Sequence, residues 1–207
     1  MQGGSGTAEN RELRPGGLAI GIGLLSLLLV LLQALPEDWR ALLQYQRAAV
    51  DAGQWWRLLT ANLVHLGWRH LALNGAALVM ILWLFGPDRG ALRWTLALAL
   101  SGLASSLGVH LSEPQVHWMV GLSGALHGLF LVAAAGWLRS GDRVAWLLLG
   151  GLLLKLGWEQ LGGPLPLTAS VVGGPVITTA HLWGSVGGLV FAAIEWRWPP
   201  RSGAAGL

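Results

Sequence analysis

The sequence predicts an all-α membrane protein, built as a bundle of six transmembrane helices. Of its 207 residues, 54% are hydrophobic and only 11% are charged, which is far from the composition of a soluble domain. Thirteen tryptophans against three phenylalanines indicate a membrane interface, where indole rings concentrate. Six apolar runs approach the roughly 20 residues needed to cross about 30 Å of hydrocarbon. They are 17–35, 69–86, 91–111, 121–138, 143–161 and 175–196.

The first run resembles a secretory signal in one respect, because Arg11 and Arg14 precede it. No small-residue cleavage site closes it before Pro36, so we expect a retained first helix. The chain then divides into a cytoplasmic N-terminal segment (1–16), one six-helix domain (17–198) and a C-terminal tail (199–207).

The orientation follows from the arginines outside the helix centres, since positive charge is retained on the cytoplasmic side. Six spans place eight of these arginines on one side and four on the other. The larger group flanks both termini, so we expect both termini in the cytoplasm and the connections 36–68 and 162–174 outside. The larger group is Arg11, Arg14, Arg89, Arg93, Arg139, Arg143, Arg197 and Arg201.

The two outer connections differ in character. The first contains the stretch 54–57 (Gln-Trp-Trp-Arg), which favours an interface-embedded segment with Arg57 free to bind phosphate or Asp51. The second, 162–174, carries no charge and is rich in Gly and Pro, so it can enter the membrane or move as a gate.

Charge and cysteine content exclude several classes of protein. The net charge is +3 and the isoelectric point about 10.6, but the Lys and Arg residues are scattered, so we expect no nucleic-acid partner. The absence of cysteine excludes disulfides, thiol catalysis and thiolate metal sites.

Polar side chains inside a membrane mark a functional site by default. Here they lie near the starts of the second, fourth and sixth runs, which all pass from outside to inside, so they share the outer leaflet. They are His70 and Asn74, Ser123 and His127, and His181 on one face with Gly184 and Gly188.

Glycines explain how these helices can meet, because small residues at i and i+4 let membrane helices approach closely. Gly184 and Gly188 form such a groove, and Gly121, Gly124 and Gly128 strip side chains from the fourth helix. Close backbones can bring a serine hydroxyl within the roughly 2.6–3.2 Å of an imidazole that nucleophilic attack requires.

Each polar group also has a purely structural interpretation. A lone membrane serine commonly bonds back to a helix carbonyl, and a lone histidine is commonly structural or handles protons. A zinc site from His65, His70, His127 and His181 is disfavoured, because Asn74 would have no purpose and no acidic ligand accompanies the histidines. We therefore expect no metal and no cofactor. A proton-coupled transporter is disfavoured by the absence of internal repeats.

Lys155 and Glu159 are i,i+4 within the fifth helix. One interpretation is a mutually neutralising pair, and the other is recognition of a substrate tail near a gate.

The polar and glycine motifs of the second, fourth and sixth runs resemble the signature of the rhomboid intramembrane serine proteases. The stretch 121–124 (Gly-Leu-Ser-Gly) is similar to the family's G-x-S-G, which implies that Ser123 is the nucleophile. Ala180-His181 with Gly184 and Gly188 is similar to A-H-x-x-G-x-x-x-G, which implies that His181 is the general base.

The resemblance continues on the second helix and in the first outer connection. His65, His70 and Asn74 reproduce H-x4-H-x3-N, which implies that His70 and Asn74 hold the oxyanion. The stretch 56–60, Trp-Arg followed by Thr, is similar to the family's W-R motif.

Most rhomboids carry a tyrosine four residues after the serine, packed on the catalytic histidine. Here the residue is His127, which is itself a candidate base because it leans back toward Ser123. We favour His181, since a base is better presented from a facing helix. The substitution and the stretches 45–47, 54–60, 125–130 and 155–160 resemble the rhombosortase branch.

That resemblance implies a monomeric, multi-pass enzyme of a Gram-negative inner membrane whose site opens to the periplasm. Its substrates would be membrane-anchored proteins with a C-terminal Gly-Gly sorting tail. No acidic residue lies in the same leaflet of a helix bearing the site, so we expect a Ser-His dyad, with His127 or water orienting His181. The alternative is a catalytically inactive rhomboid relative that binds and escorts membrane proteins.

Overall fold

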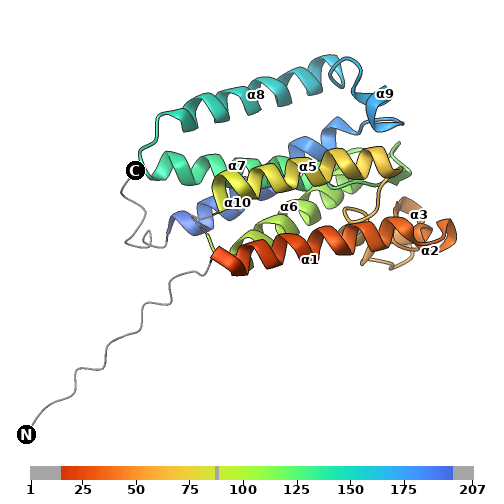
Figure 1. Ribbon diagram of the computed structural model, residues 1–207. Coiled ribbons are helices and arrows are strands. Elements are labelled where there is room, and N and C mark those ends of the chain that lie inside the picture. The colour runs from red at the N-terminus through yellow and green to blue at the C-terminus, as the bar shows by residue number, and fades with distance from the viewer. Residues whose placement is uncertain (1–14, 87–88, 198–207) are drawn as a thin grey trace, which may run out of the picture.

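The computed structural model describes residues 15–86 and 89–197, and within them six long helices lie side by side (Figure 1). The predicted N-terminal segment and C-terminal tail fall almost entirely outside the described residues. The long helices are α1 (Pro15–Ala34), α5 (Trp68–Phe85), α6 (Ala91–Ser112), α7 (Ser123–Arg139), α8 (Val144–Gly162) and α10 (Thr178–Trp196).

All six predicted runs are helical, with ends displaced by up to three residues. The run predicted from 121 begins at Ser123, because Gly121 has a φ of 117° and lies in the left-handed region outside a helix. The run predicted from 175 begins at Thr178. His181 is therefore in the first turn of α10, about 4.5 Å from its start at about 1.5 Å per residue, and not deeper in the helix.

Four of the helices are long and apolar enough to cross a membrane: Gly17–Ala34, Trp68–Phe85, Ala91–Ser112 and Val144–Gly162. The chain is thus an all-α, multi-pass membrane protein. The helices α7 and α10 fall outside this group, so the prediction of six spans remains a prediction.

The centre of the bundle is formed by α6, α7 and α10, whose backbones touch at small residues. A Cβ added to Gly184 would overlap the carbonyl oxygen of Gly124, and one added to Gly188 would overlap that of Gly128. This contact confirms that glycine faces bring the fourth and sixth predicted helices together. Around this centre, α5 packs on α7 and α1 packs on α5, while α8 lies on the opposite side of the bundle from α1 (Figure 1).

The connection 35–67, between α1 and α5, is folded. It contains α2 (Glu37–Ala41), α3 (Arg47–Asp51), α4 (Arg57–Thr60) and β1 (Tyr45–Gln46), and β1 pairs antiparallel with β2 (Trp118–Met119). Strand β2 leads directly toward Ser123, so the pairing anchors the approach to α7.

Arg57 is buried in this connection, and the prediction that it is free for phosphate or Asp51 is wrong. Its guanidinium donates to the carbonyl oxygens of Ala41 and Gln44 and to Gln54 Oε1, each at 2.7 Å. Buried backbone carbonyls need donors, and a guanidinium supplies several at once. The exposed rings of Trp55 and Trp56 agree with an interfacial position.

The start of α1 and the end of α10 lie at the same end of the bundle (Figure 1). Near this end the Arg89 guanidinium pairs with Glu195 at 2.9 Å. The helix α9 (Thr168–Val172) and the short helices α2 and α3 lie at the other end.

Candidate active site

Ser123 is the first residue of α7 and lines a cavity of about 250 Å³ at the end of the bundle near α9. The preceding turn places it there: the Gly121 N–H donates to the Ala61 carbonyl oxygen at 3.0 Å, and the His70 ring packs where a Cβ of residue 121 would be. Because the first N–H groups of a helix lack intrahelical acceptors, the backbone around Ser123 offers free donors.

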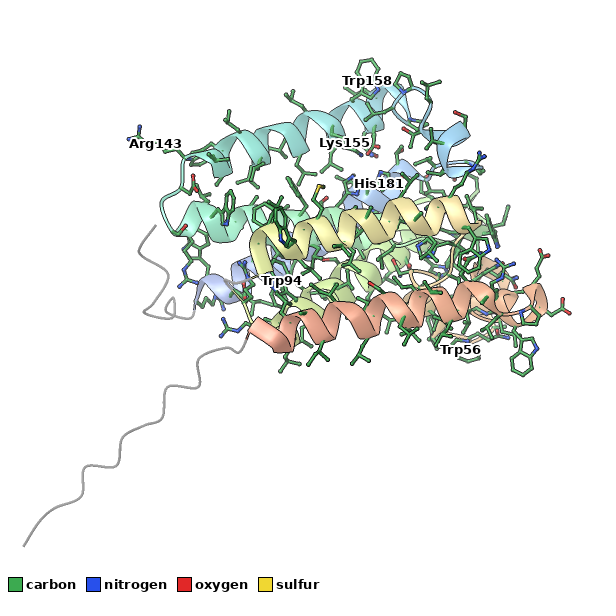
Figure 2. All side chains as sticks on the ribbon, viewed as in Figure 1. Trp56, Trp94, Arg143, Lys155, Trp158 and His181 are labelled. Atoms are coloured by element: carbon green, nitrogen blue, oxygen red, sulfur yellow. The ribbon has the colours of Figure 1, made fainter. Side chains whose placement is uncertain are left out.

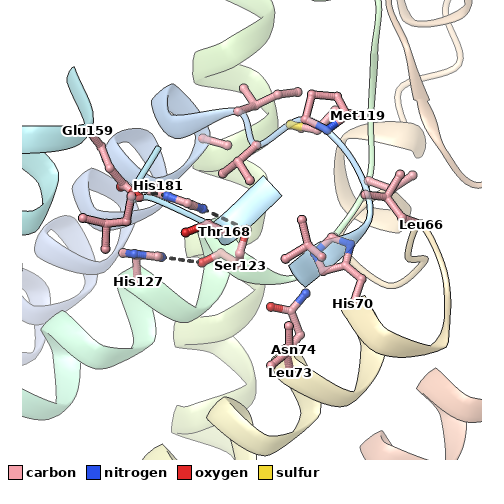
Figure 3. A pocket seen from close by; sticks show the side chains of 18 of the residues that line it. Leu66, His70, Leu73, Asn74, Met119, Ser123, His127, Glu159, Thr168 and His181 are labelled. Carbon is pink, nitrogen blue, oxygen red and sulfur yellow. Dashed lines mark hydrogen bonds and ion pairs between the residues drawn. The ribbon is translucent and has the colours of Figure 1, made fainter. Parts of the chain in front are cut away.

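His181 faces Ser123 from α10. The distance between Ser123 Oγ and His181 Nε2 is 3.0 Å, which is hydrogen-bond distance (Figure 3). The prediction that these two side chains come within hydrogen-bond distance is therefore confirmed. The glycine contact between α7 and α10 makes it possible, because bulkier residues at 124 and 184 would separate the two backbones.

The other ring nitrogen of His181 meets a carboxylate. His181 Nδ1 lies 2.9 Å from Glu159 Oε2, and the Glu159 side chain is buried. A carboxylate only accepts, so Nδ1–H donates to it and the Nε2 lone pair accepts a hydrogen bond from the Ser123 hydroxyl. The prediction that His127 or water stands in place of an aspartate beside His181 is wrong, because the Glu159 carboxylate occupies that place.

Glu159 reaches the site from α8, which bears neither Ser123 nor His181. The expectation of a dyad considered acids only on the helices that bear Ser123 and His181, so it did not include Glu159. The signal was present: the fifth helix runs outward in the predicted topology, and Glu159 lies close to its outer end. The predicted Lys155–Glu159 pair also forms, with Nζ 2.6 Å from Oε1.

His127 packs on the His181 ring and does not compete with it for the Ser123 hydroxyl. The two imidazole rings are stacked, with centroids 4.1 Å apart and planes 14° from parallel. His127 Nδ1–H donates to the Ser123 carbonyl oxygen at 2.7 Å, and no contact with the Ser123 hydroxyl is present in the described part of the chain. Of the two candidate bases, the geometry favours His181.

His70 and Asn74 line the same cavity from α5 and lie across it from Ser123 (Figure 3). Both side chains are buried, and among the described residues neither His70 Nδ1 nor Asn74 Nδ2 has a hydrogen-bond partner. An amide N–H₂ left without an acceptor is costly. Its position across the cavity from Ser123 suits a donor to an oxyanion.

His65 lies behind this pair and not in the cavity. Its ring contacts His70 edge to face, with centroids 5.1 Å apart, and is almost completely buried. Burial lowers the pKa of His65 to about 3, with the neighbouring His70 adding to the effect, so the ring is neutral and supports His70 by packing.

Among the described residues, one trio of side chains has ligand atoms close enough to hold a metal ion: those of His127, Glu159 and His181 lie within 4.8 Å of one another. Their arrangement favours a hydrogen-bond network. The two imidazoles are parallel, so their lone pairs do not converge on one point. Lys155 already places a positive charge on the carboxylate. His65 and His70, which the disfavoured zinc site required, are not part of this trio.

The connection 163–177, between α8 and α10, forms one wall of the cavity. Residues of α9 and its flanks, including Leu165, Thr168 and Val172, line the cavity from above, and Thr168 is seen over Ser123 in Figure 3. A second, apolar cavity of about 420 Å³ lies between α5, α7 and α8 and shares His127 and Lys155 with the first.

The family model described as Rhomboid domain matches residues 52–198. The putative rhomboid protease YdcA of Bacillus subtilis is 38% identical over 96 residues, covering 44% of this chain and 46% of that protein. Rhomboid-like protein 11, chloroplastic, of Arabidopsis thaliana is 26% identical over 164 residues, covering 72% and 55%. Rhomboid-like protease 5 of Toxoplasma gondii is 30% identical over 142 residues, covering 67% and 16%.

The chain spans about half the length, or less, of these curated relatives. The family model, in contrast, covers most of the chain, including every residue of the cavity described above. The chain therefore belongs to the rhomboid family.

Proposed function

We propose that this protein is an intramembrane serine endopeptidase that cleaves membrane-anchored proteins within or next to a transmembrane segment. The observation that carries the proposal is the 3.0 Å approach of Ser123 Oγ to His181 Nε2 in a covered cavity. Two of the relatives are named as proteases, which supports the same activity.

In this reaction Ser123 Oγ attacks the substrate carbonyl carbon while its proton passes to His181 Nε2. The negative charge that develops on the carbonyl oxygen is met by Asn74, His70 and the backbone N–H groups at the start of α7. When the peptide C–N bond breaks, the proton on Nε2 passes to the leaving amine. Water then takes the place of the amine and releases the acyl group from Ser123.

The substrate class in this proposal is a protein with a C-terminal Gly-Gly sorting tail, as in rhombosortases. His127 in place of a tyrosine supports this, and so does the cavity, because about 250 Å³ is small for a peptide site. Leu73, Met119 and Leu165 line it. Glycines let a substrate backbone enter where side chains would collide.

The topology in this proposal has six spans within residues 17–198, both termini in the cytoplasm, and an inner-membrane monomer whose site opens to the periplasm. The shared end of α1 and α10 supports placing the two termini on one side (Figure 1). The exposed Trp55 and Trp56 support an interface at the opposite end.

The test is co-expression with a Gly-Gly-tailed membrane protein, followed by mass spectrometry of the product's C-terminus. We expect one new terminus with the wild type and none with Ser123→Ala or His181→Ala. The control is Glu195→Gln, whose carboxylate pairs with Arg89 and does not line the cavity, and it should retain cleavage.

Full activity of His181→Ala would overturn the assignment of the base. The escort alternative predicts that the tailed protein co-purifies uncleaved with the wild type and with Ser123→Ala alike.

A further inference from the structure

Glu159 makes two charged contacts that use its two oxygens separately. Oε2 accepts from His181 Nδ1 at 2.9 Å, and Oε1 lies 2.6 Å from Lys155 Nζ. Glu159 is 3% exposed, so its contact with the buried His181 is not a loose surface pair, while the Lys155 side chain is 32% exposed. The four side chains Lys155, Glu159, His181 and Ser123 thus form one continuous chain of hydrogen bonds from α8 through α10 to α7.

We propose that Glu159 is a positioning residue for His181, held in place by Lys155, so that the serine-histidine pair works as part of a triad whose acid comes from α8. The inference rests on the proposed peptidase function. Glu159 fixes the tautomer in which Nδ1 carries the proton and Nε2 is free to accept, and its charge stabilises the imidazolium that forms during attack. It takes no proton itself.

Lys155 has a defined part in this arrangement. Its ammonium group only donates hydrogen bonds, so it requires an acceptor at Oε1 and fixes which oxygen is left for His181. Its positive charge also offsets the cost of burying the carboxylate before an imidazolium exists. Figure 2 shows Lys155 on the side of α8 that faces His181, whereas Trp158 points away from the bundle.

A purely structural ion pair between Lys155 and Glu159 would explain the 2.6 Å contact but not the one to His181. The two interpretations differ for Glu159→Gln. With Lys155 present, the amide oxygen must face the ammonium, so the amide N–H₂ faces His181 Nδ1. That contact favours the opposite tautomer, in which Nε2 carries a proton and cannot accept one from Ser123.

Removing Lys155 frees the amide to turn. In the double variant Glu159→Gln with Lys155→Met, the amide oxygen can face Nδ1–H and restore the productive tautomer. A second substitution in a merely structural pair would not restore activity. Recovery in the double variant is therefore specific to the positioning role.

The experiment measures kcat and KM of the full-length protein in liposomes with a Gly-Gly-tailed substrate peptide, together with thermal unfolding of each variant. We expect Glu159→Gln to lower kcat by about 10²–10⁴-fold with KM little changed. The double variant should recover at least about tenfold of this loss, because the imidazole regains its tautomer.

The matched control is Glu195→Gln. Glu195 is on α10, at the end of the bundle far from the cavity, and its carboxylate is also ion-paired, in this case with Arg89. The Glu195→Gln variant should keep kcat. If Glu159→Gln unfolds, Glu159→Asp serves instead: it keeps the charge but shortens the side chain by one methylene, and we expect a reduced kcat in a folded protein.

The inference is overturned if the wild type cleaves and Glu159→Gln retains kcat within threefold, or if the folded double variant is no faster than Glu159→Gln. An inactive wild type whose Ser123 is not labelled by a fluorophosphonate would instead overturn the proposed function. The two failures are therefore distinguishable.

Discussion

Ser123 and His181 are held by helices whose backbones touch, whereas Glu159 is held by a helix that is mostly exposed. Gly124, Gly128, Gly184 and Gly188 allow no added Cβ without overlap, but Gly150 and Gly157 on α8 have no neighbouring atom within 4 Å of such a Cβ. Of the α8 span 22% is buried, against 39% of the α6 span. The backbone contact between α7 and α10 thus positions Ser123 and His181, whereas Glu159 is positioned by α8, which has few other buried contacts.

The two halves of the site should therefore respond differently to the same kind of substitution. Substitutions in the glycine contact between α7 and α10 should act through folding. Substitutions on α8 and in the cavity should act on turnover in a folded protein.

The largest effect is expected for Gly184→Ala. The added Cβ overlaps the Gly124 carbonyl oxygen, and a packed backbone cannot move away cheaply, so we expect about 1–3 kcal/mol of destabilisation or more, with loss of cleavage. Thermal unfolding in detergent measures it. Gly150→Ala on α8 is the control and should leave stability unchanged or raised, because alanine is the better helix former. Equal destabilisation by Gly184→Ala and Gly150→Ala would contradict the proposed difference between the α7–α10 contact and α8.

Asn74→Ala should lower kcat by about 10²–10³-fold and leave the protein folded, since Asn74 Nδ2 bonds to nothing in the described residues and, in the proposed mechanism, donates only to the oxyanion. Steady-state kinetics measures this loss. Asn62 is the matched contrast: its amide donates to the Gly102 carbonyl oxygen and to Ser106 Oγ. Asn62→Ala should reduce stability, with near-normal kcat per folded molecule, and the reverse pattern would exclude Asn74 from the oxyanion site.

The smallest effect is expected for Lys155→Met. Glu159 keeps His181 as a partner, so the tautomer survives and kcat should fall by less than about tenfold. A loss as large as that of Asn74→Ala would show that Lys155 contacts substrate directly, as in the tail-recognition interpretation. Kinetics with tailed and tail-less peptides separates the two, because only tail recognition makes the loss depend on the tail.

The six helices were predictable because long apolar runs and bilayer thickness determine them with little help from tertiary contacts. The pairing of Ser123 with His181 was predictable for a related reason: helix direction gave their common leaflet, and glycine spacing gave their close approach. Both arguments use one-dimensional patterns that survive folding almost unchanged.

Other features depend on contacts between distant segments. The two-residue strands of β1 and β2 carry no periodicity, and Arg57 is buried only because the connection folds over it. The sequence indicates Lys155 or a substrate tail as the partner of Glu159, because an i,i+4 pair already accounts for its charge. A carboxylate has two oxygens, however. The sequence pattern does not show that the second oxygen of Glu159 accepts from His181 on α10.

The proposed peptidase function is tested most directly by fluorophosphonate labelling of the full-length protein in membranes. The modified residue is located by mass spectrometry. We predict labelling at Ser123 in the wild type, strong reduction in His181→Ala, and none in Ser123→Ala. Labelling of the wild type at another residue, or undiminished labelling of Ser123 in His181→Ala, would contradict the claim that these two side chains act together.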